Sequence, residues 1–137
     1  MKALILVAAM CCASLAMAHD IYNGLRMKDG TLPCCGGSDA GAARDCWRTI
    51  YRERGGDFEF RTRSGDWVHV PTDRIQFTPI PGDQVEEGET HEAHLCYRDD
   101  PQTVENYHEY HNTDRLLKTV SGKEIVFYCG IIPPGGL

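Results

Sequence analysis

Six histidines give this chain its clearest potential for metal chemistry, because imidazole is the most common side-chain ligand of transition metals. His91 and His94 are three residues apart, and so are His108 and His111. Residues with this spacing share one face of a helix, so His108 and His111 could share a metal ion if their segment is helical. Neither pair matches the His-Glu-x-x-His motif of zinc proteases. The favoured interpretation of both pairs is therefore solvated histidines among acidic neighbours.

Cysteines are the second group of residues with chemical potential. Cys11 and Cys12 lie in an apolar N-terminal run, and the other five are Cys34, Cys35, Cys46, Cys96 and Cys129. Adjacent Cα atoms are about 3.8 Å apart, closer than the usual disulfide span, so we do not expect Cys34 to pair with Cys35. Five cysteines form at most two bridges and leave one thiol. The preferred pattern joins Cys34 or Cys35 to Cys46, with a second bridge involving Cys129.

The remaining thiol suggests a cysteine–histidine nucleophile as another possibility. Such a site needs a free, exposed thiol beside a base such as His94. The Cys34-Cys35 pair also lacks the Cys-x-x-Cys spacing of thiol–disulfide oxidoreductases. Structural bridges are the simpler interpretation, because a bridge that closes a dozen residues stabilises a small domain by roughly 3 kcal/mol.

Residues 1–18 predict export. An apolar run follows Lys2, and alanines occupy positions 16 and 18, which is the arrangement of a secretory signal peptide. We expect cleavage after Ala18, with a cut after Ala16 as the alternative. The mature protein would then be periplasmic or secreted, and an oxidising compartment of this kind favours disulfides.

Two other interpretations of the N-terminal segment are weaker. The apolar run is too short for a membrane anchor, since a spanning helix needs about 20 apolar residues. A lipoprotein signal is disfavoured because Met10 precedes Cys11, where a small residue is expected. We therefore expect no stable membrane insertion once residues 1–18 are removed.

Cleavage after Ala18 would give His19 two nitrogen ligands, its α-amine and its imidazole. A second imidazole could come from one or more of His69, His91, His94, His108 and His111. With His94, His108 or His111 as partner, the site would be similar to the histidine brace of copper-dependent polysaccharide monooxygenases and of some periplasmic copper carriers. Because Cu(II) binds most tightly in the divalent series, copper is the cofactor that the sequence suggests.

The composition limits the range of partners. Removal of residues 1–18 from the 137-residue chain leaves 119 residues, about one domain, and Lys2 is the only charged residue removed. The rest carries 13 basic and 20 acidic side chains, a net charge of −7. This balance argues against binding to nucleic acid and to anionic membranes. An unidentified protein or envelope component is the expected partner.

The pattern of apolar and turn residues predicts a β-dominated α+β domain, with a small antiparallel sheet of two hairpins, one short helix and disulfide staples. Glycines punctuate an irregular segment at 19–45, and the β core spans 46–137. Strands are expected at 47–52, 58–61, 67–70, 75–78, 93–97, 116–120 and 124–129. The first strand is expected to end at Gly55-Gly56, and the two hairpins are expected to turn at 64–66 and at 121–123. A solvated loop is expected at 82–90. Asp100 and Pro101 predict the start of a helix that ends near Asn112.

The aromatic residues divide into two sets. Six fall on the expected strands and are interpreted as core rather than as a carbohydrate platform: Trp47, Phe58, Phe60, Trp67, Phe77 and Phe127. Tyr107 and Tyr110 fall on the short helix, where we expect exposed side chains that could contact a partner.

Landmarks along the chain give a family resemblance. They are His19-Asp20-Ile21-Tyr22, Cys34-Cys35, Asp45-Cys46, His94-Leu95-Cys96, Cys129 and Pro133-Pro134-Gly135. They resemble a family of small exported bacterial proteins with a His-x-x-Tyr start, a Cys-Cys and Asp-Cys framework and a final Cys before a Pro-Pro-Gly tail. The segments after Cys35 and after Cys96 are longer here than in that family. The resemblance implies export and a cysteine framework, and it implies no catalytic residue.

Three functions follow from the sequence. The preferred one is a non-enzymatic exported domain that acts by binding. The alternative is a protein that binds copper or another transition metal through His19, and the third is a small secreted enzyme. An enzyme would need ionisable residues that converge in a pocket, and the spacing of residues in the sequence does not show such a group.

Overall fold

The computed structural model describes residues 25–30, 33–34, 45–80, 93–110 and 113–134. Within these residues the elements are, in order, β1 (Cys46–Thr49), β2 (Tyr51–Arg54), β3 (Asp57–Arg61), β4 (Trp67–Val70), η3 (Thr72–Arg74), β5 (Ile75–Gln76), β6 (Ala93–Arg98), α1 (Pro101–Tyr110), η4 (Thr113–Arg115), β7 (Leu116–Lys118) and β8 (Glu124–Ile131). Here η denotes a 3₁₀-helix. The predicted β-dominated α+β class with one short helix is confirmed. The proposed signal peptide and the expected loop at 82–90 lie outside the described residues.

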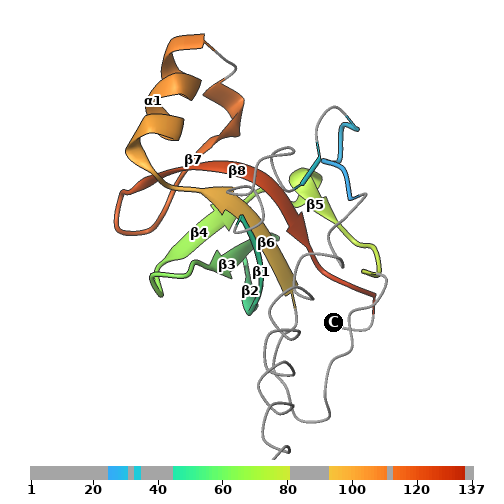
Figure 1. Ribbon diagram of the computed structural model, residues 1–137. Coiled ribbons are helices and arrows are strands. Elements are labelled where there is room, and N and C mark those ends of the chain that lie inside the picture. The colour runs from blue at the N-terminus through green and yellow to red at the C-terminus, as the bar shows by residue number, and fades with distance from the viewer. Residues whose placement is uncertain (1–24, 31–32, 35–44, 81–92, 111–112, 135–137) are drawn as a thin grey trace, which may run out of the picture.

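The described strands form two sheets (Figure 1). The larger sheet has the order β1-β6-β8-β5, and β7 also pairs with β8. The smaller sheet is the meander β2-β3-β4. An isolated bridge between Val68 and Thr119 joins β4 to the segment after β7, while the chain itself joins β1 to β2. The two sheets therefore surround a common core.

The expected first strand is two strands that belong to different sheets. β1 pairs with β6 and β2 pairs with β3, and Ile50 lies between them. The Arg61 amide donates to the Ile50 carbonyl at 3.1 Å, and the Thr49 hydroxyl donates to the Arg61 carbonyl at 2.6 Å. These bonds hold the bend at which the chain passes between the sheets.

The two predicted hairpins of the chain are present. In the first, β3 and β4 pair in register from Phe58↔Val70 to Arg61↔Trp67, on either side of the turn expected at 64–66. In the second, β7 and β8 pair in register from Leu116↔Val126 to Lys118↔Glu124. The turn chemistry of the sequence was therefore sufficient to locate both hairpins.

A further hairpin joins β2 to β3, where Gly55 and Gly56 form a two-residue loop with φ of 64° and 90°. Positive φ at both loop residues is the requirement of a type I′ turn, whose twist matches that of the paired strands.

Two apolar clusters lie on opposite faces of the larger sheet. One fills the space between the sheets and includes Phe58, Phe60 and Leu95. The other lies on the outer face and includes Met27, Val126 and the four bridged cysteines. Because both faces are covered, β6 and β8 are buried along almost their whole length. This explains why β8 is continuously apolar from Ile125 to Ile131 rather than alternating.

The prediction for 75–78 was wrong in two respects. β5 is only two residues long, and it runs parallel to β8 rather than antiparallel to a neighbour. Phe77 lies beyond it and is 47% exposed, so it is not a core residue, although its ring packs edge-on against Phe58 at 5.9 Å. Prolines at 79 and 81 limit strand pairing here, because proline has no amide hydrogen to donate.

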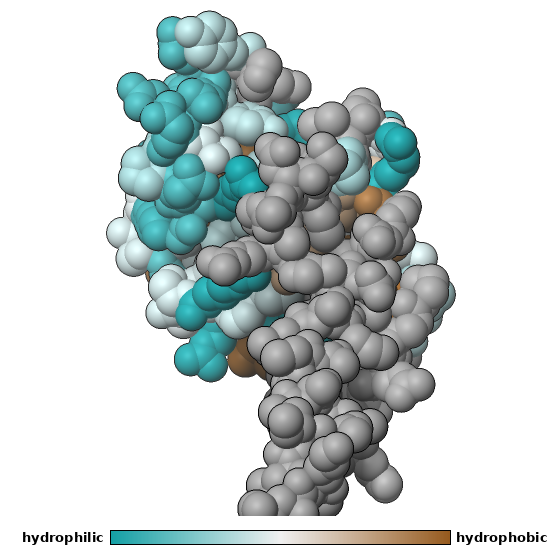
Figure 2. All heavy atoms as spheres, in the orientation of Figure 1, coloured by the Kyte–Doolittle hydropathy of each residue, from teal (hydrophilic) through white to brown (hydrophobic). Residues whose placement is uncertain are grey.

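Helix α1 begins as the sequence indicated. The Thr103 amide donates to the Asp100 carboxylate at 2.9 Å, which is the expected N-cap bond, and Pro101 is the first helical residue. Tyr110 is exposed as predicted. Tyr107 is partly buried against the outer-face cluster, so the expectation that it is exposed was wrong. The visible surface around α1 is hydrophilic (Figure 2).

No helix among the described residues is long and apolar enough to cross a membrane.

Candidate functional site

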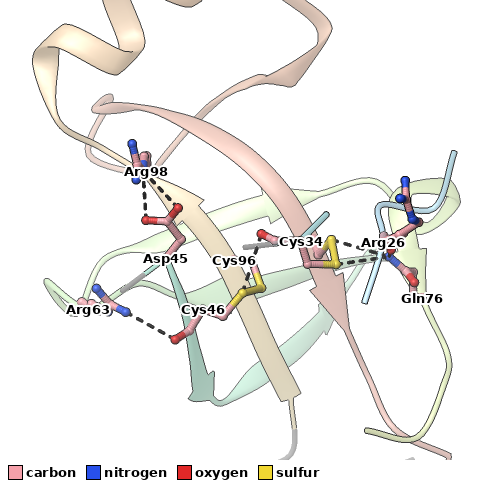
Figure 3. The surroundings of a disulfide bond; sticks show 9 residues. Arg26, Cys34, Asp45, Cys46, Arg63, Gln76, Cys96 and Arg98 are labelled. Atoms are coloured by element: carbon pink, nitrogen blue, oxygen red, sulfur yellow. Dashed lines mark hydrogen bonds and ion pairs between the residues drawn. A yellow bond between two sulfur atoms is a disulfide. The ribbon is translucent and has the colours of Figure 1, made fainter. Parts of the chain in front are cut away.

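Two disulfides connect the strands, and their partners differ from the predicted pattern (Figure 3). Cys34 is bonded to Cys129, and Cys46 is bonded to Cys96. The prediction that Cys34 or Cys35 pairs with Cys46 was wrong, because Cys46 is bonded to Cys96, which lies directly opposite it in the β1–β6 register. Cys129 is bridged, as expected. Cys35 lies outside the described residues, so its thiol stays a prediction.

The Cys34–Cys129 bridge fastens the segment 25–34 to β8. The Cys34 amide also donates to the Leu25 carbonyl at 2.9 Å, which closes the segment into a short loop. A second attachment comes from the Gln76 side-chain amide, which donates to the Arg26 carbonyl at 2.9 Å (Figure 3). This N-terminal segment is therefore tied both to β8 and to β5.

A buried ion pair anchors the start of β1. Arg98 Nε donates to both carboxylate oxygens of Asp45 at 3.0 Å (Figure 3). Burial raises the pKa of Asp45, and the hydrogen bond and charge of Arg98 oppose that shift. The same hydrogen bond raises the pKa of Arg98. Because burial outweighs the ion pair at Asp45, we interpret this pair as structural.

A pocket of about 390 Å³ lies over β8. This volume is within the range of small-molecule sites, roughly 300–1,000 Å³. Its walls come from three segments far apart in the sequence, and its floor comes from one strand. The lining residues are Met27, Lys28 and Asp29 of the N-terminal segment, Asp73 and Arg74 of η3, Asp114 and Arg115 of η4, and Phe127 and Tyr128 of β8.

Several of the pocket's charges are already engaged within the protein. Arg115 pairs with Asp29 at 3.3 Å and also contacts the Met27 sulfur. Arg74 donates to the backbone carbonyl of Asp114. These contacts join the three walls to one another: the N-terminal segment to η4, and η4 to η3. The pocket is therefore a built structure rather than a gap between loops.

Two charged side chains of the pocket, one cationic and one anionic, have no partner in the described part of the chain, whereas Arg74 is bonded to a backbone carbonyl. Among the described residues, the side chains of Lys28 and Asp73 make no hydrogen bond or ion pair. The floor is apolar because it consists of two aromatic residues, Phe127 and Tyr128. They are largely buried, with 5% and 7% of their surface exposed. Burial also raises the pKa of Tyr128, which keeps its hydroxyl neutral. The pocket thus offers charges of both signs beside aromatic rings.

The two predicted metal ligands that the structure describes, His94 and His108, lie far apart. His94 is fully buried in β6 opposite Ile131, at one end of β8. His108 Nε2 lies 2.9 Å from the carboxylate of Glu124, at the other end. Seven residues of strand separate these ends, roughly 20 Å, so these two imidazoles cannot share one metal ion. A metal site built on His19 could therefore use one of these two histidines but not both.

Of the other four histidines, His69 is the one that lies within the described residues. His69 is half-exposed and lies 3.2 Å from a carboxylate oxygen of Asp57. His19, His91 and His111 lie outside the described residues, so a copper site built on His19 stays a prediction. Among the residues that the structure does describe, no three histidine, cysteine, aspartate or glutamate side chains are grouped to hold a metal ion.

The sequence did contain a signal for the pocket, and it was missed. The tripeptide Thr-Asp-Arg occurs twice, at 72–74 and at 113–115. Each copy forms a 3₁₀-turn that leads directly into a strand paired with β8. Both turns contribute an aspartate and an arginine to the pocket. Without the β8 pairing, nothing in the sequence placed the two copies side by side.

Comparison of the chain with protein-family models, with curated proteins and with solved structures finds no match. The resemblance to a family of small exported proteins therefore stays a prediction.

Proposed function

We propose that this chain is an exported, non-enzymatic binding protein and that the pocket over β8 is its ligand site. The observation that carries the proposal is the construction of the pocket. Three distant segments meet over one strand, and one of these segments is held to that strand by a disulfide. A preformed concave site with an apolar floor and a few polar groups is the usual form of a small-ligand site.

The disulfides are compatible with an oxidising compartment, where such bridges form and persist. They also serve the binding role directly. A wall that is fixed before the ligand arrives lowers the entropic cost of binding. Export and binding therefore support each other in this interpretation, since the pocket wall would depend on oxidation of the chain.

The test is native mass spectrometry of the protein purified from the periplasm of an expression host. The wild type is compared with Asp73→Trp, in which the indole would occupy the pocket, and with Glu53→Trp on the exposed face of β2. We expect the wild type and Glu53→Trp to retain a small molecule that Asp73→Trp has lost. Circular dichroism establishes that both variants are folded.

Two outcomes would overturn the proposal. The first is retention of the same molecule by Asp73→Trp, which would place binding elsewhere. The second is the absence of any retained molecule in the wild type together with no pocket-specific chemical-shift change in a fragment screen. If Asp73→Trp does not fold, Asp114→Trp on the neighbouring wall serves as the blocking variant.

A further inference from the structure

The pocket occupies a break in the pairing of β8. On one edge of this strand, β7 pairs with Glu124 to Val126 and β5 pairs with Gly130 and Ile131. Neither strand pairs with residues 127–129, which lie between these two stretches. A short length of this edge therefore has no paired strand among the described residues, although its residues are mostly buried by other parts of the chain. Open strand edges are the surfaces on which proteins bind extended peptide backbone.

The lining residues place the pocket at this edge rather than over one face. Phe127 and Tyr128 are consecutive, and consecutive strand residues point to opposite faces of a sheet. Both nevertheless line the same pocket. This is possible where the pocket opens at the edge of β8, because both faces are reached from there. A ligand in the pocket would thus meet strand backbone as well as aromatic side chains.

The two charged side chains of the pocket without a partner among the residues that the structure describes, Lys28 and Asp73, indicate the polarity of its ligand. Lys28 requires an anionic group, and Asp73 requires a cationic one, if neither charge is to be buried without a partner when a ligand fills the site. The Arg115 guanidinium is held by Asp29 and Met27, so its charge is already paired within the protein. A ligand of single charge would satisfy one of the two groups and repel or strand the other.

We propose that the pocket binds an α-amino acid zwitterion, either as a free amino acid or as a dipeptide. This inference rests on the proposed binding function and names its ligand class. The carboxylate pairs with Lys28 and the α-ammonium pairs with Asp73. An apolar side chain packs against Phe127 and Tyr128, and the second residue of a dipeptide would extend along the edge of β8 that β5 and β7 leave unpaired.

The test is calorimetric titration of the exported protein with phenylalanine, glycylphenylalanine, N-acetylphenylalanine and phenylalaninamide. The last two compounds each lack one of the two charges. We expect each to bind about 10- to 100-fold more weakly than phenylalanine, which is the usual effect of losing one charge-assisted hydrogen bond. Tighter binding of glycylphenylalanine than of phenylalanine would assign the site to dipeptides, and the reverse would assign it to free amino acids.

Two variants connect each charge of the ligand to one residue. Lys28→Gln should weaken phenylalanine by about tenfold and leave phenylalaninamide unchanged. Asp73→Asn should weaken phenylalanine and leave N-acetylphenylalanine unchanged. Lys118→Gln and Glu53→Gln remove charges of the same signs away from the pocket and should alter neither.

The proposal is overturned if the blocked compounds bind as tightly as phenylalanine, or if Lys28→Gln and Asp73→Asn weaken all four compounds equally. The binding function fails separately. If Asp73→Trp loses a retained molecule that is not a zwitterion, the pocket is a ligand site and only the ligand class is wrong. If the wild type neither retains a molecule nor binds any of the four compounds, both are wrong.

Discussion

Removal of the Cys34–Cys129 bridge should destabilise the protein strongly, because this bridge closes a long loop. The two cysteines are 95 residues apart, and a loop of that length corresponds to about 4.7 kcal/mol of denatured-state entropy. The Cys46–Cys96 bridge shortens the path, however. With that bridge intact, 12 residues separate Cys34 from Cys46 and 33 separate Cys96 from Cys129. The effective loop is about 45 residues, which lowers the expected loss to about 4 kcal/mol.

Cys35 must be removed first, because it could replace Cys34 as the partner of Cys129. The parent is therefore Cys35→Ala, and the test variant adds Cys34→Ala and Cys129→Ala. Urea unfolding followed by circular dichroism gives the free energy of unfolding of each. A loss of about 4 kcal/mol is most of the stability of a domain near the lower end of the usual range of about 5–15 kcal/mol.

The same series tests the pocket. Even if the test variant is folded in the absence of urea, it should not bind the ligand that the parent binds. The reason is that the bridge fixes the wall that carries Met27, Lys28 and Asp29. A loss of less than about 1 kcal/mol would refute the loop-entropy reasoning. It would mean that Gln76 and the packing of Met27 hold the segment almost as well as the bridge does. Cys35→Ala itself should unfold like the wild type, since neither bridge uses Cys35.

Three further changes have expected outcomes. Arg98→Leu leaves Asp45 buried without its partner and should cost about 3 kcal/mol at pH 7 in urea unfolding. Because burial raises the folded-state pKa of Asp45 above its unfolded value, this deficit should shrink as the pH falls through that raised pKa, and it should be gone at about pH 4, where the carboxyl begins to be protonated in the unfolded state as well. Ser121→Ala should raise the pKa of Asp66 from about 2 toward its ordinary value, measured by NMR titration, since the Ser121 hydroxyl is the largest cause of its depression. The stability that Asp66 contributes is present above its unfolded pKa and is lost as the pH falls through about 2. Gly130→Ala should lower the melting temperature and cost about 1–2 kcal/mol, because the added Cβ would lie 3.2 Å from a buried ring.

Local signals in the sequence were sufficient for much of the fold. The Gly55-Gly56 loop and the Asp100-Pro101 helix start were each predicted from residues that fix backbone geometry within a few positions. The bend at Ile50 was not predictable in this way. The apolar alternation from Trp47 to Tyr51 continues through it, and the break depends on hydrogen bonds to Arg61, which is more than ten residues away. Local patterns therefore identified elements, while their partners depended on distant contacts.

The disulfides and the pocket also depended on distant contacts that local sequence patterns do not show. That four of the cysteines would be paired followed from their number and the predicted compartment, but the partners follow from strand register, which places Cys46 opposite Cys96 and leaves Cys129 for Cys34. The two Thr-Asp-Arg copies are visible in the sequence, yet they become neighbours through the pairing of β5 and β7 with a single edge of β8. Because those two strands together cover only part of that edge, the same pairing that completes the sheet also leaves the opening in which the pocket forms. The candidate site is thus a consequence of strands that are too short to cover their partner, and a change that lengthened β5 or β7 along β8 should close the pocket while leaving the sheet intact.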